Sequence, residues 1–186
     1  SVSENDFRDT LARWPSGVTV VTARAGDTPI GITVASFSSL SLDPPLVLVC
    51  IARSAQSHDG LVGAPGFAIH VLGASQEEMS ARFARPGADK FGAYADQPGP
   101  FGVPLLPFDV ARLVCAAHAA HDGGDHTILI GRVVSVEHAG TDPLLDDSNA
   151  AAPQLNPQLA TEIREGTGRG TFLSRLGRIR ARVTSG

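Results

Sequence analysis

The stretch Pro29–Ala52, PIGITVASFSSLSLDPPLVLVCIA, decides the fold. Two apolar runs rich in β-branched residues, Pro29–Ala35 and Leu46–Ala52, enclose a segment in which serines alternate with apolar residues. The first run predicts a strand, and the second is uniformly apolar, as expected of a strand buried on both faces. Asp43–Pro45 breaks the pattern between them. The stretch therefore predicts two strands of a β-rich domain.

Further strands and short helices flank this stretch. Gly17–Ala23 is rich in β-branched residues and, across the turn AGDTP, predicts a hairpin with Pro29–Ala35. Phe7, Leu11 and Trp14 have the spacing of a short amphipathic helix that ends before Pro15. Other strands are expected at Gly66–Leu72, Leu113–His118 and Ile128–Val136, and helices at Ser54–Val62 and Ser75–Ala84, the latter opened by a Ser75–Glu78 capping box. Strands that are apolar on both faces predict a mainly β fold, a barrel with short flanking helices.

Composition narrows the class of protein. The chain has 186 residues, 20 glycines and 13 prolines, which favours one turn-rich domain over a helical bundle. A net charge of −4 argues against a nucleic-acid partner, and no apolar run is long enough to span a membrane. Cys50 and Cys115 each lie in an apolar run, so we expect two buried thiols and a reducing, cytoplasmic location.

The C-terminal part differs in character from the rest. We expect one domain over residues 1–186, with its core at about 5–138 and a divergent extension at 139–186. The tail at 171–183 alternates arginine with apolar residues from Arg178 onwards, which predicts a strand packed across a neighbouring subunit. A solvated face is the alternative for its four arginines.

Hydroxyl side chains form the densest polar cluster, at Thr33, Ser36, Ser38, Ser39 and Ser41. Hydroxyls and free amides at a strand end suit an anion or the polar edge of a ring. The alternative is a serine-rich loop that meets only water.

Two smaller sets follow along the chain. Arg53, Ser54 and Ser57 come directly after a buried strand, where Arg53 suits a phosphate. A surface arginine beside a helix-capping serine is the alternative. The other set is formed by Arg82–Phe83 and Lys90–Phe91. Its alternative interpretation is an arginine at the end of a helix and a lysine, Lys90, in a loop ion pair with Asp89.

Three other site types are disfavoured. A further polar cluster, which could suggest zinc, comprises His118, His121, Asp122, Asp125 and His126. His118 and His121 would lie on opposite faces of a strand, and no cysteine or glutamate at ligand spacing joins them, so we expect no metal. No G-x-S-x-G elbow indicates a serine hydrolase. No G-x-G-x-x-G follows a strand, so a nucleotide cofactor would need another binding mode.

Read in order, the segments resemble the short-chain flavin reductases, the reductase components of two-component flavin-dependent monooxygenases. The matching pieces are FRDTLARWPSGVTVVTA, GITVASFSSLSLDPPLVLVCIARSAQS, GFAIHVL, QEEMSARFA, ADKF and GDHTILIGRV. The second and last pieces are specific as an ordered set. The match spans about residues 5–138, and the extension after it departs from the family's usual short aromatic tail.

The resemblance implies an FMN-binding split β-barrel that works as a homodimer. It implies that the isoalloxazine edge of FMN or FAD is contacted by Thr33, Val34, Ala35 and Ser36. The ribityl and phosphate portion would be held by Ser38, Ser39, Ile51, Ala52, Arg53, Ser54 and Ser57. The residues closing over the flavin would be Arg82, Phe83, Lys90 and Phe91. His126, in the GDH motif, would lie near the nicotinamide of NADH or NADPH.

The function that follows is hydride transfer from NAD(P)H to a flavin, with the reduced flavin passed to a monooxygenase partner. Uncharged hydroxyls and amides suit a ring edge that gains negative charge on reduction. A second hypothesis remains open: a flavin- or haem-binding module on the same barrel, without reductase turnover.

Overall fold

The computed structural model describes residues 2–14, 16–87, 89–94, 97–139 and 145–146. Contacts divide the chain into a unit at 1–149 and a second at 150–186, and every described residue belongs to the first. The strand expected at 171–183 therefore lies outside the described residues. The proposed boundary at 138 and the single domain over 1–186 stay predictions.

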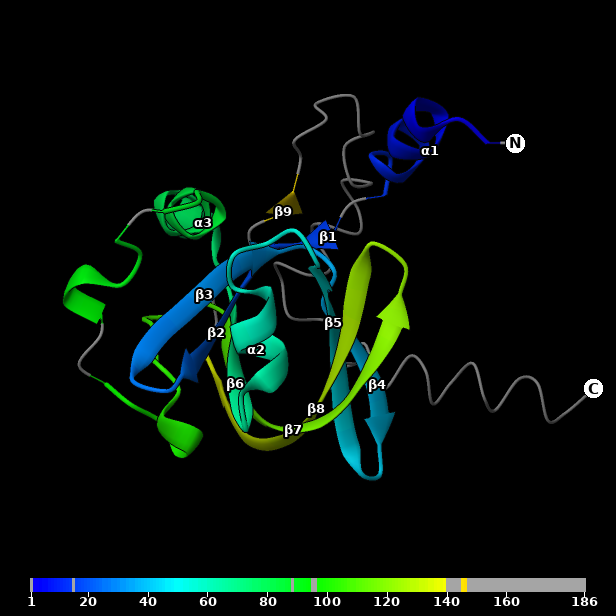
Figure 1. Cartoon of the computed structure of the whole chain (residues 1–186). Coiled ribbons are helices and arrows are strands. Elements are labelled where there is room, and N and C mark those ends of the chain that lie inside the picture. The colour runs from blue at the N-terminus through cyan, green and yellow to red at the C-terminus, as the bar shows by residue number, and fades with distance from the viewer. Residues whose placement is uncertain (1, 15, 88, 95–96, 140–144, 147–186) are drawn as a thin grey trace, which may run out of the picture. The chain divides into compact units, whose positions relative to one another are not determined.

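Seven antiparallel strands form the main sheet, in the order β3-β2-β6-β7-β8-β5-β4 (Figure 1). They are β2 (Thr19–Ala25), β3 (Thr28–Val34), β4 (Ser38–Leu42), β5 (Pro45–Ala52), β6 (Gly66–Val71), β7 (Ala111–Gly123) and β8 (His126–His138). A separate two-stranded sheet joins β1 (Ser16–Gly17) to β9 (Leu145–Asp146). The chain enters the main sheet by the predicted β2–β3 hairpin and crosses from β3 through β4 to β5.

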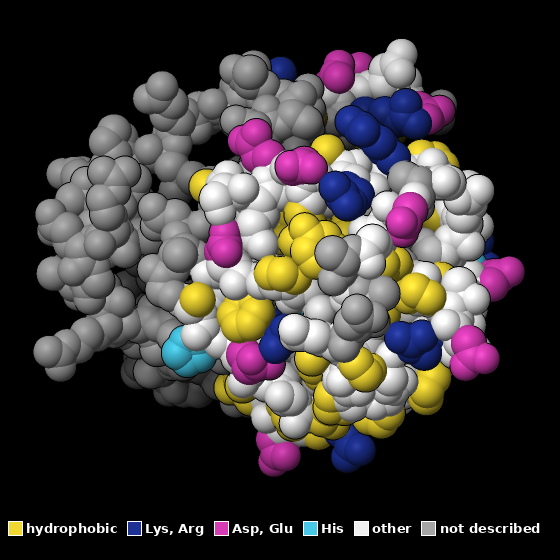
Figure 2. Space-filling view, turned by 90° about the vertical axis from the view of Figure 1, so that its left-hand side faces the viewer, with side chains coloured by type: hydrophobic (Ala, Val, Ile, Leu, Met, Phe, Trp, Pro, Cys, Tyr) yellow, Lys and Arg dark blue, Asp and Glu magenta, His cyan; other side chains and the backbone are white. Residues whose placement is uncertain are grey.

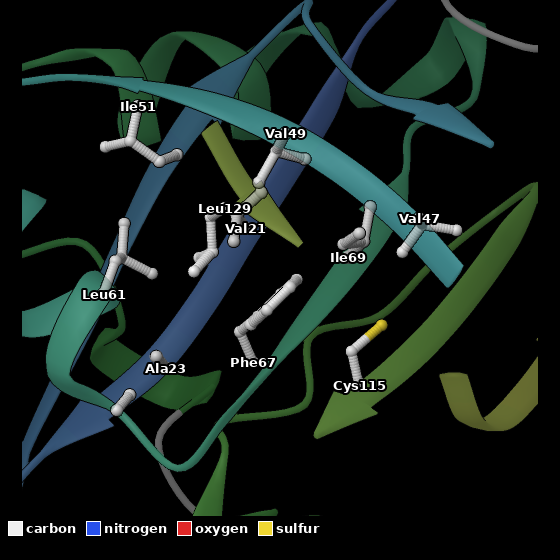
Figure 3. Packing of buried hydrophobic residues seen from close by; sticks show 11 residues of the cluster. Val21, Ala23, Val47, Val49, Ile51, Leu61, Phe67, Ile69, Cys115 and Leu129 are labelled. Atoms are coloured by element: carbon white, nitrogen blue, oxygen red, sulfur yellow. The ribbon is translucent and has the colours of Figure 1, made fainter. Parts of the chain in front are cut away.

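The barrel core lies where β2 and β6 face β5 across the curled sheet (Figure 3). Val21 of β2, Phe67 of β6 and Val49 of β5 are all fully buried there. Gly131 of β8 lies against Phe67, and a Cβ built on it would come within 2.5 Å of the ring. Glycine at that position lets the ring fill the barrel without a clash.

Helix α2 (His58–Gly63) closes the space between the β2–β3 pair and β5 (Figure 1). Its Leu61 is fully buried in the barrel core, and the His58 ring is joined to the Thr127 hydroxyl of β8 by a 2.8 Å hydrogen bond. Helix α2 therefore ties the two halves of the barrel together beside the start of β8.

The outer face of β2 carries a second core. Helix α3 (Glu77–Ala84), preceded by the 3₁₀ turn η1 (Ala74–Gln76), packs on β3 and β2. The 3₁₀ turns η2 (Gly92–Tyr94) and η3 (Pro100–Gly102) follow it. Val20, Phe83 and Leu106 are fully buried in this layer. Because Val20 and Val21 point to opposite faces, β2 is buried on both, as a barrel flanked by helices requires.

The mainly β fold predicted from the sequence is confirmed, with differences at element ends. Strands β7 and β8 are far longer than the apolar runs that predicted them, because their outer halves alternate polar and small residues. Strand β5 is fully buried on one face only, and its other face is half-buried.

The predicted helices need three corrections. The helix expected at Ser54–Val62 begins only at His58, because residues 53–57 form turns. Helix α1 (Glu4–Leu11) forms, capped by the Ser3 hydroxyl, but ends before Trp14. The Ser75–Glu78 capping box is wrong. The Ser75 hydroxyl donates to the Asp109 carboxylate instead. Gln76 accepts from the main-chain N–H of Gly73 at 3.0 Å, so the turn starts two residues before the serine.

His70 of β6 fastens the loop after α3 to the outer face of the sheet. Its Nδ1 donates to the Val20 carbonyl at 3.1 Å, and its Nε2 accepts from the Leu106 N–H at 3.0 Å. Both contacts require a neutral ring. Burial lowers the His70 pKa from 6.5 to about 4. An unfolded chain thus binds a proton that the folded chain does not, across this pH range.

We expect the folded protein to lose stability on acidification because of His70. Between about pH 6.5 and pH 4 the shift removes about 3 kcal/mol from the free energy of unfolding. His70→Gln should be less stable than the parent near neutrality but should lack this acid-dependent loss. Urea unfolding across that range measures it, with the exposed His121→Gln as control. Equal pH slopes in parent and His70→Gln would contradict the assignment.

Candidate functional site

The hydroxyl-rich segment runs along the rim of the barrel, from the end of β3 into β4. The Ser36 hydroxyl accepts from the Cys50 N–H at 2.9 Å and donates to the Cys50 carbonyl at 3.0 Å. The Thr33 hydroxyl donates to the Ser80 carbonyl of α3 at 2.7 Å. These two hydroxyls thus hold the rim to β5 and α3, so the rim offers a ligand its main chain rather than these side chains.

The other predicted rim residues differ in exposure. Val34 packs against the barrel core, whereas Ala35 is exposed. Ser38 and Ser39 are exposed at the start of β4, opposite Leu48 and Val47 of β5. The Ser38 hydroxyl donates to the Ser39 carbonyl at 3.2 Å, at the exposed edge of the sheet.

A cavity of about 430 Å³ lies between the start of β3, the loop before α2 and the loop after α3, and none of the hydroxyl-rich residues 33–41 lines it. Its walls hold three of the predicted residues: Ser57, Lys90 and Phe91. The rest of the lining is Thr28, Pro29, Ile30, Gly31, Gln56, Gly87, Asp89 and Gly92. Glycines in the wall bring the main chain close to any occupant.

Lys90 fixes the loop that forms one wall of this cavity. Its ammonium donates to the Gly31 carbonyl at 3.1 Å and to the Phe83 carbonyl at 2.9 Å. Burial lowers the Lys90 pKa. An ammonium has three donors, and these contacts use two of them. Lys90 therefore joins β3, α3 and the loop, and its expected ion pair with Asp89 is not among the described contacts.

The two phenylalanines support this wall from behind. Phe83 is fully buried and meets Phe91 edge to face, with ring centroids 5.2 Å apart. A Cβ on Gly31 would come within 2.8 Å of the Phe83 ring, so glycine is needed where β3 passes the pair. Phe91 borders the cavity, whereas Phe83 lies behind Phe91 and supports its ring.

Arg82 lies in a neighbouring hollow of about 220 Å³ with Glu78, Ala81, Arg85 and Asp89. Its guanidinium approaches the Glu78 carboxylate at 3.3 Å. Figure 2 looks onto the face that carries α3 and the segments after it, where basic and acidic side chains surround apolar patches. Asp89 borders both hollows, so the two are adjacent.

His126 lies at the other end of the rim, at the start of β8. It pairs with Ala52, the last residue of β5, and its side chain is 42% exposed. Its Nδ1 lies 2.7 Å from the Asp125 carboxylate, and this hydrogen bond lowers the Asp125 pKa. With Asp125 ionised, Nδ1 carries the proton and Nε2 is left to face a ligand.

Arg53 contacts the same turn. Its main-chain N–H donates to the Asp125 carbonyl at 2.9 Å, its Nε donates to the Gly124 carbonyl at 2.9 Å, and a terminal nitrogen lies 2.7 Å from the Asp122 carboxylate. Ser54 beside it is exposed, and Ile51 is fully buried in the barrel core. Ile51 can therefore meet a ligand only through its main chain.

No group of three or more metal-ligating side chains is present in the described part of the chain. His118 and His121 are both exposed on the outer half of β7. His121 lies opposite Ile128 in the ladder with β8, which offers no second ligand there.

Sequence reasoning missed Gln56, which accepts from the Gly87 N–H at 3.2 Å and lines the cavity. It had no local signal, because its partner lies 31 residues away. Asp122 and Asp125 were identified as part of a polar cluster with the histidines, but their contacts with Arg53 and His126 were not predicted.

Comparison with known proteins identifies the family. The profile of the flavin reductase like domain matches residues 11–152. The chain belongs to this family. It is therefore an oxidoreductase that acts on flavin, and its barrel is the split barrel of the flavin reductases.

Individual relatives agree. The FMN reductase (NADH) SmoA of Agrobacterium fabrum is 47% identical over 145 residues, which make up 76% of this chain and 81% of the relative. The reductase subunit HsaB of a flavin-dependent monooxygenase from Mycobacterium tuberculosis is 35% identical over 135 residues, 73% of this chain and 72% of HsaB. The solved NADH:FAD oxidoreductase SgcE6 of Streptomyces globisporus, in complex with NAD and FAD fragments, superposes with a TM-score of 0.72 at 39% identity, covering 77% of this chain and 87% of SgcE6.

The described residues fit a flavin. The cavity is lined mainly by glycines and uncharged side chains, with Lys90 and Asp89 as its two charged residues. Polar main-chain groups suit the ring edge and the ribityl chain, and a cation suits a phosphate.

Lys90→Met tests whether the ammonium holds the cavity wall in place. Methionine keeps the apolar stem but loses both carbonyl contacts, so we expect a loss of about 1–2 kcal/mol in the free energy of unfolding and weaker flavin binding. Thermal unfolding and flavin titration measure the two effects. Arg85→Met, a charge removal at an exposed position after α3, is the control and should leave stability unchanged. A stable Lys90→Met protein with parental affinity would refute this role.

Proposed function

We propose that this chain transfers a hydride from NADH or NADPH to FMN or FAD and releases the reduced flavin to a monooxygenase component. The observation that carries the proposal is that β5 connects the two candidate regions: Ser36 of the rim binds the main chain of Cys50, and two residues further on Ala52 pairs with His126. The names of SmoA, HsaB and SgcE6 support the same chemistry.

The flavin residues are assigned by what each can offer. The ring edge is met by the main chain of Thr33, Val34, Ala35 and Ser36, because the Thr33 and Ser36 hydroxyls are engaged. The ribityl and phosphate portion is met by Ser38, Ser39 and Ser54, by Ser57 in the cavity, and by the main chain of Ile51 and Ala52. Lys90 and Phe91 close the cavity, with Phe83 and Arg82 behind and beside them.

His126 serves the nicotinamide side. Its Nε2 orients the carboxamide of the nicotinamide or balances charge as the ring is oxidised, while Asp125 holds Nδ1. When bound, the flavin supplies the two-electron acceptor for the hydride of the reduced nicotinamide. The side chains of this protein orient the two rings and exclude water, and none acts as a nucleophile.

The first test is anaerobic reduction. NADH or NADPH should bleach the flavin absorbance at about 450 nm in the presence of the protein, with FMN and FAD compared in parallel. The preferred pair of substrates is the one with the higher kcat/KM. If the flavin is bound but neither nicotinamide bleaches it, the chain is the alternative, a binding module without turnover.

A His126→Ala variant separates hydride transfer from flavin binding. We expect kcat/KM for the nicotinamide to fall by about 10- to 100-fold while flavin affinity changes less than about twofold. Stopped-flow reduction and fluorescence titration give the two values. His118→Ala, at an exposed position of β7, is the matched control. Unchanged nicotinamide oxidation in His126→Ala would remove His126 from the reaction.

The homodimer belongs to the same proposal. Strands β5 and β8 turn Leu48, Cys50, Ile128 and Ile130 away from the barrel core, and these side chains are only half-buried in the described residues. Two exposed apolar side chains of β8, Val134 and Val136, extend this face by the same alternation. A second copy of the chain covers the face and places His126 near the boundary between subunits.

Sedimentation tests the dimer. The protein should have twice the 19.3 kDa mass of the chain. Val136→Glu, at a β8 position on this face that is 63% exposed, should shift it toward the monomer without unfolding it. Leu11→Glu, on α1 and 54% exposed, is the control for an apolar-to-charged change outside the face. A monomeric parent protein would contradict the dimer.

The cellular setting completes the proposal. None of the described helices is long and apolar enough to cross a membrane. We assign the protein to the cytoplasm, with a diffusing reduced flavin as its link to the oxygenase and no nucleic-acid partner. The two free cysteines, Cys50 and Cys115, suit a reducing compartment.

A further inference from the structure

The tip of the β7–β8 hairpin extends past the strands that flank it. Strand β6 leaves β7 at the Gly66–Ala116 pair, so no described strand borders the outer half of β7 on that side. Strand β5 reaches the end of β8 with its last pair, Ala52–His126. The turn at Gly124 and Asp125 lies beyond that pair. Sheet pairing therefore holds the turn that precedes His126 only from β7 and β8 themselves, through the closing Gly123–His126 pair.

Arg53 adds contacts to this turn from the neighbouring strand. It is the residue immediately after β5, and it reaches across to the turn with one main-chain and two side-chain donors. The side chain contacts the Gly124 carbonyl and the Asp122 carboxylate on successive parts of the turn. Asp122 also accepts from the Gly124 N–H at 3.3 Å. The turn is thus held on both sides by one guanidinium and one carboxylate.

These contacts continue to the His126 ring. The Asp125 carbonyl is held by Arg53, and the carboxylate of the same residue accepts from His126 Nδ1 at 2.7 Å. Because the main chain of Asp125 fixes where its carboxylate can reach, a displaced turn would change the orientation of the imidazole.

We propose that Arg53, together with Asp122, is a positioning residue that holds the β7–β8 turn so that Asp125 orients His126. That His126 matters for catalysis rests on the proposed function, whereas the contacts of Arg53 and Asp122 do not depend on it. This positioning role assigns the Arg53 side chain to the turn rather than to a flavin phosphate. Contacts with the turn already engage Nε and one terminal nitrogen of Arg53.

Asp122→Ala separates the two roles of Arg53. It removes the partner of the guanidinium but leaves the guanidinium itself available for a phosphate. If Arg53 binds the flavin phosphate, Arg53→Ala should lower flavin affinity and Asp122→Ala should leave it unchanged. If Arg53 instead positions the turn, the two variants should have the same phenotype, and flavin affinity should change less than about twofold in both.

The structural readout uses flavin-free protein. Amide hydrogen exchange at residue 53 reports its bond to the Asp125 carbonyl, and this amide should lose protection in Asp122→Ala although that substitution does not touch it. Imidazole chemical shifts of His126 should show a smaller share of the Nδ1–H tautomer in both variants. Arg24→Ala is the matched control, since Arg24 makes similar side-chain bonds to the Gly102 and Asp27 carbonyls.

The kinetic readout separates the nicotinamide from the flavin. Both variants should lower kcat/KM for the nicotinamide by about three- to tenfold, as expected for partly exposed charged contacts. The double variant should be little worse than either single one, because the two side chains act on one turn.

Each result bears on a different claim. If Asp122→Ala leaves the residue 53 amide and the His126 tautomer unchanged, the positioning role is wrong. The same holds if Arg53→Ala alone lowers flavin affinity. If both variants disturb His126 but neither they nor His126→Ala alter nicotinamide oxidation, the positioning stands and the proposed role of His126 is what fails.

Discussion

The antiparallel pairing of β5 with β8 is the constraint on which the site depends. It places Val49 opposite Leu129 and Ile51 opposite Thr127 on the core face, and by alternation it turns Cys50 and His126 to the outer face. A shift of one residue in this register would send His126 into the barrel and the core residues outward. The burial of the apolar side chains therefore fixes the position of a polar one that contributes nothing to the core.

At the rim and the cavity, too, contacts made for the fold determine what a ligand can meet. Ser36 binds both main-chain groups of Cys50, and Lys90 binds the carbonyls of Gly31 and Phe83. These polar side chains of the site hold main chain in place. What remains for a ligand is largely backbone. This arrangement suits a flavin that must leave after reduction, because it gives contacts of defined shape without a dense set of charges. Arg53 extends the pattern to the turn before His126.

Much of the fold follows from short-range patterns. The β2–β3 hairpin, the apolar run of β5 and the length of β6 were all readable, since each depends on local periodicity and turn residues. Errors fell where long-range contacts decide. Ser75 contacts Asp109 rather than capping its own helix, and the outer half of β7 is extended only because β8 pairs with it. The rim hydroxyls were identified as a cluster, but their internal partners were not.

By itself the sequence determined the strand pattern, the family and the residue types at the rim, because apolar alternation, β-branched runs and an ordered set of motifs are local properties of the chain. Only the tertiary structure decided which of the candidate side chains are free. Ile51 and Phe83 are buried, Thr33, Ser36 and Lys90 are engaged with main chain, and Arg53 is joined to Asp122. The physical reason is that a donor's partner is set by the folding of distant segments onto one another, and no spacing along the chain records that choice.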